Sequence, residues 1–167
     1  FSVLSYECPK GFLCAMGCGL HEGEADSQAR AELSKIFNVK VVSKFTTIRS
    51  TYGNVDEQFV SEVISEHVAN KLEGVVIEKR INDNDEFCAH AVLNTVLFSE
   101  KIKDQILHLV DESKKLSKSG RNLVWEKIKN NNSKVKNLSA LLAAIDVDNV
   151  SKMILKGKLP KLNISLR

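Results

Sequence analysis

The chain has 167 residues, of which 43% are hydrophobic and 27% charged, a composition that excludes fibrous and disordered proteins. A chain of this length can form a core without metals or dense disulfides, and its longest apolar run, residues 89–98, is too short to span a bilayer. Residues 1–100 carry a net charge of −6, whereas residues 101–167 carry +9. This asymmetry indicates two surfaces with different partners.

The N-terminal part of the chain predicts a strand followed by a helix. Residues 12–18 form a mostly apolar run that is typical of a buried strand, and residues 19–23 predict a turn. Across residues 24–45, apolar side chains recur every four positions, and acidic side chains occupy the first turn, where the helix dipole favours them. We therefore predict a helix there. Its Val-rich second half, residues 37–45, leaves a strand open as an alternative.

A second helix is predicted after a turn at residues 50–54. Asp56 is placed to cap its N-terminus, and an apolar stripe at spacings of three and four continues to Leu72. Gly74 stands where a glycine commonly ends a helix.

An antiparallel hairpin follows this helix. Residues 75–81 predict one strand, and residues 87–98 form a second β-rich run. The polar residues 82–85 between them predict the turn. The same residues lack the glycine and the closing glutamate of a calcium loop, so we expect no calcium site.

Beyond the hairpin the pattern is helical. Ser99 is the expected cap, the pair Ser119 and Gly120 separates two helices, and residues 130–132 are expected to interrupt the second of these. Apolar residues then continue to Ile154.

These elements predict an α+β fold. Its core domain, residues 1–98, is expected to hold a three-stranded antiparallel sheet packed against two helices. Residues 99–157 form a basic helical extension, and the apolar alternation in residues 158–167 predicts a terminal strand. Because the chain begins at Phe1 rather than Met, we expect a mature or trimmed chain whose export signal has been removed.

Four cysteines offer several pairings. Cys8 and Cys14 enclose a turn-prone loop, so a disulfide between them is sterically reasonable and would add roughly 2 kcal/mol of stability. Cys14 and Cys18 lie about 13 Å apart on one face of a strand and cannot pair. Cys18 and Cys88 can meet only if the first and third strands are neighbours. Free core thiols stay an alternative, but a zinc site does not, because the paired C-x-x-C spacing is missing.

No catalytic or cofactor-binding pattern stands out. Residues 17–23 are rich in glycine between a strand and a helix, but Glu22 and Glu24 would place carboxylates where a nucleotide loop holds phosphates. The histidines lack paired spacing, and no G-x-S-x-G turn is present. We therefore expect a protein that is not an enzyme, with no cofactor and no metal.

The basic half of the chain is the candidate binding region. Its lysines have two interpretations: a solvated helical surface, or a site for an anionic partner such as a lipid headgroup or an envelope polymer. Aromatic residues make up 6% of the chain, and nucleic-acid-binding motifs are absent from the sequence, so a nucleic-acid partner is disfavoured. The candidate residues are Lys114, Lys115, Lys118, Arg121, Lys127, Lys129, Lys134 and Lys136.

The order of these segments resembles the twenty-kilodalton bacterial envelope lipoprotein family, whose domain also occurs in flagellar-assembly proteins. The resemblance covers about residues 12–110 and consists of small-residue and apolar patterning, with Cys88 where an aromatic residue is expected. It lies in residues 15–19, 25–35, 39–45, 72–77 and 87–93.

The resemblance implies an exported, non-enzymatic protein of the periplasm or outer membrane, often lipid-anchored. Members associate with flagellar or envelope assemblies, so we expect a scaffold or adaptor that binds a protein partner, itself or an envelope polymer. Any lipid anchor would lie upstream of this chain, because Tyr6 and Glu7 do not suit lipidation at Cys8. The alternative is a cytosolic nucleic-acid-binding module that uses the basic half.

Overall fold

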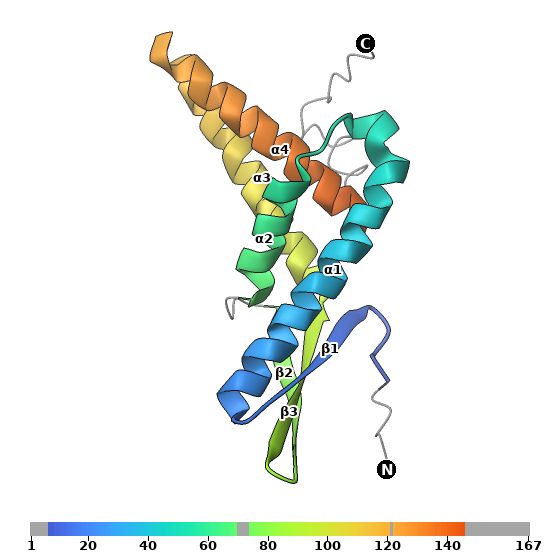
Figure 1. Ribbon diagram of the computed structural model, residues 1–167. Coiled ribbons are helices and arrows are strands. Elements are labelled where there is room, and N and C mark those ends of the chain that lie inside the picture. Colours follow the sequence, from blue (N-terminus) through green and yellow to red (C-terminus); the bar gives the residue numbers. More distant parts are fainter. Residues whose placement is uncertain (1–6, 70–73, 121, 146–167) are drawn as a thin grey trace. The chain divides into compact units, whose positions relative to one another are not determined.

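The computed structural model describes residues 7–69, 74–120 and 122–145 (Figure 1). The fold is α+β, as predicted, and contains one three-stranded antiparallel sheet. Its elements are the strands β1 (Phe12–Gly19), β2 (Val75–Asp83) and β3 (Glu86–Asn94), the helices α1 (Glu22–Tyr52), α2 (Glu57–Ala69), α3 (Thr95–Lys118) and α4 (Trp125–Ile145), and a short 3-10 helix at Asn122–Val124.

The chain divides into two compact units. The first contains residues 1–39 and 62–98, and the second contains residues 40–61 and 99–167. The helices α1 and α2 therefore each contribute residues to both units. The predicted domains at 1–98 and 99–157 stay predictions, and the predicted terminal strand at 158–167 lies outside the described residues.

The sheet of the first unit has the order β1-β3-β2, with β3 in the centre. Both of its pairings are antiparallel, and β1 runs beside β3 from Phe12 opposite Asn94 to Gly19 opposite Phe87. β2 and β3 form the predicted hairpin. Its two turn residues, Asn84 and Asp85, both have positive φ angles, as a type I′ turn requires.

A register shift between Ile77 and Lys79 interrupts the pairing of β2 with β3. Such a bulge places two residues opposite one and breaks the strict alternation of side chains. Past the bulge, Arg80 donates two hydrogen bonds to Asp26 of α1, at 3.0 and 2.7 Å.

Close contact between β1 and α1 organises the first unit. A Cβ atom at Gly17 would lie 2.7 Å from the Ala29 Cα atom, closer than real Cβ contacts occur. Ala25, Ala29 and Leu33 repeat every four residues and are fully buried. Small residues on both elements therefore allow the strand and the helix to approach to backbone contact.

The second unit is helical. Its fully buried side chains include Phe45 of α1, Ile102 and Ile106 of α3, and a continuous run of small and aliphatic residues in α4. Within this unit Asp56 caps α2 as predicted, because its Oδ1 accepts a hydrogen bond of 3.0 Å from the Phe59 N–H. The Asp56 N–H donates to Asn137 Oδ1 at 3.1 Å, which ties this cap to α4.

Several element boundaries differ from the predictions. The turn predicted at residues 50–54 begins later, at Gly53, since α1 continues to Tyr52. The helix ends at Gly53, whose φ of +67° and hydrogen bond to the Arg49 carbonyl are those of a C-terminal glycine cap. The start of α1 is also earlier than predicted, at Glu22. The strand alternative for residues 37–45 is wrong as well.

The boundary between β3 and α3 lies at Asn94, so the predicted strand over residues 87–98 is too long. Asn94 Oδ1 accepts hydrogen bonds from the Val96 and Leu97 N–H groups, at 3.0 and 3.2 Å. Asn94 is therefore the N-cap, and the prediction that Ser99 caps this helix is wrong.

The interruption predicted at residues 130–132 is absent, because α4 is continuous. Asn131 is buried within it and donates a hydrogen bond of 2.9 Å to Glu112 of α3. Only this middle asparagine faces the neighbouring helix, since Asn130 and Asn132 are exposed. The predicted end of α2 beyond Ala69 and the apolar run beyond Ile145 fall outside the described residues.

Candidate functional site

Two disulfides hold β1 in the first unit. Cys8 pairs with Cys14, with a Cα–Cα distance of 5.7 Å, and Cys18 pairs with Cys88. The second pair joins residues directly opposite each other on β1 and β3, 4.0 Å apart at their Cα atoms. The predicted Cys8–Cys14 bond is therefore present, and so is the Cys18–Cys88 bond that the sequence left open. Disulfides of this kind persist in oxidising compartments.

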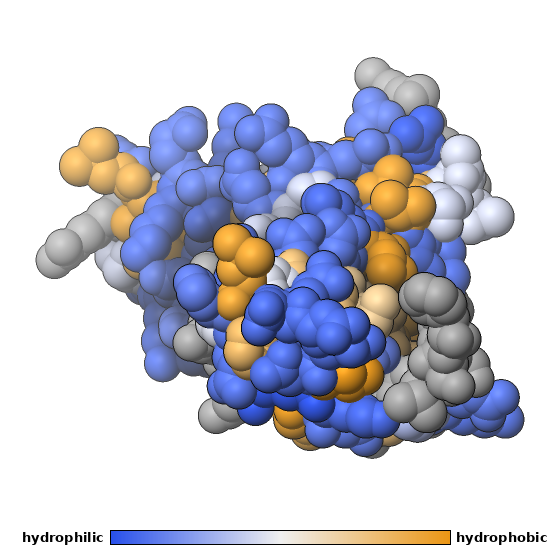
Figure 2. All heavy atoms as spheres, turned by 60° about the horizontal axis from the view of Figure 1, so that its bottom comes forward, coloured by the Kyte–Doolittle hydropathy of each residue, from blue (hydrophilic) through white to orange (hydrophobic). Residues whose placement is uncertain are grey.

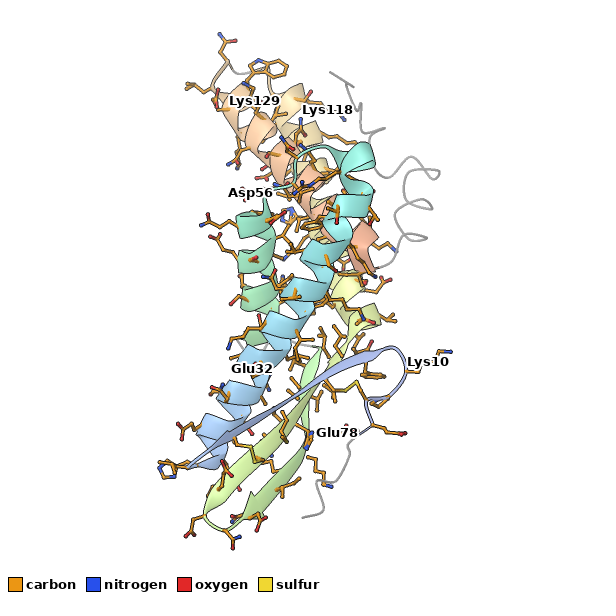
Figure 3. All side chains as sticks on the ribbon, turned by 45° about the vertical axis from the view of Figure 1, so that its right-hand side comes forward. Lys10, Glu32, Asp56, Glu78, Lys118 and Lys129 are labelled. Carbon is orange, nitrogen blue, oxygen red and sulfur yellow. A yellow bond between two sulfur atoms is a disulfide. The ribbon has the colours of Figure 1, made fainter. Side chains whose placement is uncertain are left out.

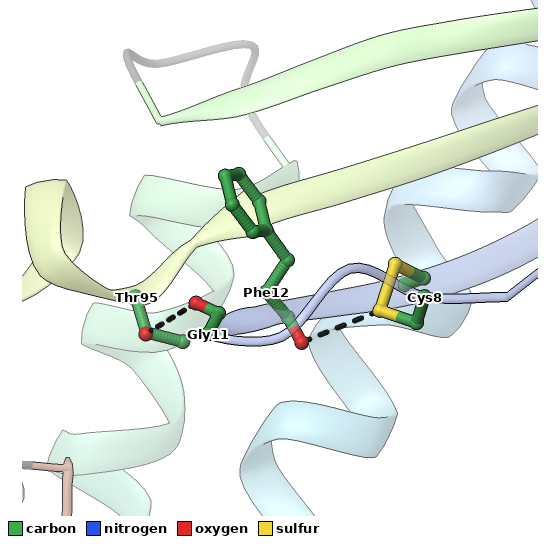
Figure 4. The surroundings of a disulfide bond; sticks show 5 residues. Cys8, Gly11, Phe12 and Thr95 are labelled. Carbon is green, nitrogen blue, oxygen red and sulfur yellow. Dashed lines mark hydrogen bonds between the residues drawn. A yellow bond between two sulfur atoms is a disulfide. The ribbon is translucent and has the colours of Figure 1, made fainter.

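The Cys8–Cys14 disulfide closes the loop that leads into β1 (Figure 4). Cys8 Sγ lies 3.3 Å from the Phe12 carbonyl oxygen, a sulfur–oxygen contact, because a disulfide sulfur has no proton to donate. Thr95 Oγ1 donates a hydrogen bond of 2.8 Å to the Gly11 carbonyl. The loop is thus fixed both to β1 and to the residue that follows β3.

The face of the sheet turned away from α1 carries exposed apolar side chains. Cys14, Met16 and Cys18 alternate with Gly17, which faces α1, so they share the opposite face. Met16, Phe12 and Val76 on that face are exposed. On the face that Figure 2 shows, apolar side chains form separate patches among hydrophilic ones. This arrangement offers a contact surface but no enclosed pocket.

The strongest candidate site lies in the second unit, where α3 and α4 form an antiparallel pair. Glu112 of α3 contacts Lys127 of α4 at 2.7 Å, which fixes the register of the two helices. Their connected ends bring basic side chains together, and Figure 3 shows Lys118 and Lys129 at this same end. We call these residues the hairpin tip: Lys114, Lys115, Lys118, Leu123, Trp125, Lys127 and Lys129.

The structure separates the predicted lysines into two groups. The five tip lysines are all exposed, whereas Lys134 and Lys136 are half-buried and lie two to three turns along α4 from Trp125. Arg121 lies outside the described residues. Residues 111–136 hold eight basic and three acidic side chains, so the net charge of this segment is +5.

Ion pairs neutralise only part of this charge. Lys115 pairs with Asp111 at 2.9 Å, and Lys127 pairs with Glu112. Lys114, Lys118 and Lys129 form no ion pair with any described residue. These three ammonium groups are therefore available to an anionic partner.

The Lys127 ammonium also sets the ionisation of Glu112. A hydrogen bond from Lys127 is the main cause that lowers the pKa of the Glu112 carboxyl, followed by the hydrogen bond from Asn131. Because the folded-state pKa lies below the unfolded one, the stabilisation is present above the unfolded pKa and is lost as the pH falls through the folded pKa. Acid therefore weakens this link between α3 and α4.

We expect the variant Lys127→Met to raise the pKa of Glu112 toward its ordinary value, because the variant removes the hydrogen bond that contributes most to lowering this pKa. A carbon-detected NMR titration of the Glu112 side chain measures the change. Lys129→Met is the control, because Lys129 forms no ion pair with the described residues. Equal titration midpoints for the wild type and Lys127→Met would contradict the assignment.

Sequence reasoning missed the two apolar residues of the tip. Leu123 and Trp125 lie in the helical run predicted after Gly120, and their side chains are 93% and 67% exposed. The sequence signal for their exposure is their position directly after the Ser119–Gly120 break and between lysines.

Other kinds of site find little support in the described residues. They contain no group of three or more side chains placed to hold a metal ion. Within the same ranges, no helix is both long and apolar enough to cross a bilayer. His21, His67, His90 and His108 lie on different segments, as the sequence indicated.

Comparison of the chain with family models, with curated proteins and with solved structures found no match. The resemblance to the envelope lipoprotein family therefore stays a prediction of the sequence.

Proposed function

We propose that this chain is a non-enzymatic adaptor of the bacterial cell envelope that binds an anionic partner through its basic helical hairpin. The observation that carries the proposal is the cluster of lysines without ion partners among the described residues, Lys114, Lys118 and Lys129, at one end of α3 and α4. Opposite charge attracts such a partner over a Debye length, about 8 Å at physiological salt.

The location in the proposal, periplasm or outer membrane, is supported by the two disulfides. A cytosolic protein would keep its cysteines reduced. Thiol counting on the protein under denaturing conditions tests this support, and four free thiols in material taken from its native compartment would contradict export.

The adaptor role also requires a surface for a protein partner. We assign it to the sheet, which we expect to pack against two helices on one face and to present Phe12, Met16 and Val76 on the other. The outer edges of β1 and β2 offer backbone groups to an added strand. By its resemblance, the chain would act in envelope or flagellar assembly.

A nucleic-acid-binding module is the rival proposal, because the same lysines attract phosphates. It predicts tight, strongly salt-dependent binding to polynucleotides. The disulfides disfavour it, since nucleic acids are found mainly in reducing compartments.

The variant Lys114→Gln, Lys118→Gln and Lys129→Gln tests the function, because it removes the three lysines that form no ion pair with a described residue. We expect it to elute from an anionic polysaccharide column, or to leave anionic vesicles, at a markedly lower salt concentration than the wild type. The measurement is elution or co-sedimentation across a salt series. Lost charge is the physical reason, because screened attraction depends on the number of free ammonium groups.

The matched control removes the same charge elsewhere, with glutamine at Lys10, Lys40 and Lys44, all of them exposed. Equal loss in both variants would show that only net charge matters and would contradict the hairpin site. Tighter binding to duplex DNA than to either anionic probe would favour the rival.

A further inference from the structure

The hairpin tip exposes two large apolar side chains that the fold does not use. Leu123 belongs to the 3-10 helix Asn122–Val124, and Trp125 is the first residue of α4. Leu123 is the most exposed large apolar side chain of the described residues, at 93%, and Trp125 is 67% exposed. The transfer of such side chains from water into an apolar environment is favourable.

Lysines of both helices lie at the same end of the hairpin as this apolar pair. Lys118 lies at the end of α3, and Lys127 and Lys129 follow Trp125 in the first two turns of α4. The rise of an α-helix places Lys129 about 6 Å from Trp125 along the axis. Exposed apolar side chains at the same end as several ammonium groups are the chemistry that suits the boundary between lipid headgroups and acyl chains.

We propose that the hairpin tip inserts into the headgroup region of an anionic lipid bilayer, with Leu123 and Trp125 in contact with the acyl chains and the lysines of the tip on the lipid phosphates. This inference rests on the proposed function, because it identifies the anionic partner. Tryptophan prefers this interfacial depth, since its ring is apolar and its N–H can stay hydrated.

A hydrated polymer explains less of the structure than a bilayer does. A polymer neutralises the lysines but gives Leu123 no apolar environment. It could also lie along α4 and contact Lys134 and Lys136, which a bilayer at the tip reaches poorly. These two lysines lie about 14 and 16 Å from Trp125 along the helix axis, beyond the screening length.

Vesicle binding of the full chain tests the insertion. The probe is a vesicle of phosphatidylglycerol and phosphatidylethanolamine, with pure phosphatidylcholine as the neutral reference. Trp125 is the only tryptophan of the chain, so its fluorescence reports on the tip alone. We expect the emission to shift to shorter wavelength on anionic vesicles and to be quenched by brominated acyl chains.

Two pairs of variants separate apolar from charge contributions in vesicle flotation. Leu123→Ser should weaken binding about tenfold, whereas Leu20→Ser, at a residue 70% exposed in the first unit, should leave binding unchanged. Lys118→Gln with Lys129→Gln should weaken it more than Lys134→Gln with Lys136→Gln, although both pairs remove the same charge. Circular dichroism confirms the fold of each variant.

The outcomes distinguish this inference from the proposed function. Vesicle binding with an unquenched Trp125 and no effect of Leu123→Ser would overturn insertion and leave binding by charge intact. Binding to an anionic polysaccharide but not to vesicles would also overturn insertion and leave binding by charge intact. Quenching of Trp125 by single-stranded DNA, without any response to vesicles, would indicate base stacking and overturn it. Binding to none of these probes would overturn both proposals.

Discussion

Gly17→Ala is expected to destabilise the protein by at least about 3 kcal/mol or to prevent folding of the first unit. The added methyl group would overlap the backbone of α1 at Gln28 and Ala29, and a backbone cannot move aside as a flexible side chain can. The strand would have to separate from the helix along their whole contact. Urea unfolding followed by circular dichroism measures the loss.

Gly23→Ala is the matched control, because a Cβ atom there meets nothing within 4 Å and the residue lies in the first turn of α1. We expect that change to be neutral or to stabilise the protein by up to about 1 kcal/mol. If Gly17→Ala were as stable as Gly23→Ala, the close approach of β1 and α1 would be wrong.

Removing the Cys18–Cys88 disulfide is the second large effect. The bond closes a loop with a sequence separation of 70, so the double variant Cys18→Ala and Cys88→Ala should lose about 4 kcal/mol through the greater entropy of its unfolded chain. The measurement is the midpoint of urea unfolding of the variant compared with that of the oxidised wild type.

The shorter disulfide provides the comparison. Cys8 and Cys14 are separated by 6 residues, for which the same reasoning gives about 2 kcal/mol. We therefore expect the Cys8→Ala and Cys14→Ala variant to keep more of its stability. A reversed order, with the shorter loop the more costly to lose, would show that loop entropy is not the main contribution.

The first unit was largely predictable because its signals are local. Apolar runs bounded by turn residues located the strands, and Asn84 and Asp85 supplied the turn chemistry of the hairpin. The geometry of a strand excluded a Cys14–Cys18 bond. A Cys18–Cys88 bond required β1 to lie beside β3. That neighbour relation is long-range, and sequence reasoning left it open.

The helical unit was harder to predict because tertiary contacts override local signals there. The three asparagines at 130–132 resemble a break, yet Asn131 is buried and bonded to Glu112. The grouping of residues 40–61 with the helices after Ser99 has no signal in the sequence. The lysines of the candidate site could be named, but their separation into a tip and a distant pair needed the helix register.

The two disulfides also give β1 a mechanical property. Tension applied to the amino end of the chain passes from Cys8 to Cys14, along β1 to Cys18, and across to Cys88 on the central strand, entirely through covalent bonds. In an ordinary edge strand the same pull would peel hydrogen bonds away one pair at a time. Here the pairs from Phe12 to Gly17 can still open, but the Cys18–Cys88 bond stops the opening at the far end of β1, so the oxidised sheet keeps its edge strand under such a pull.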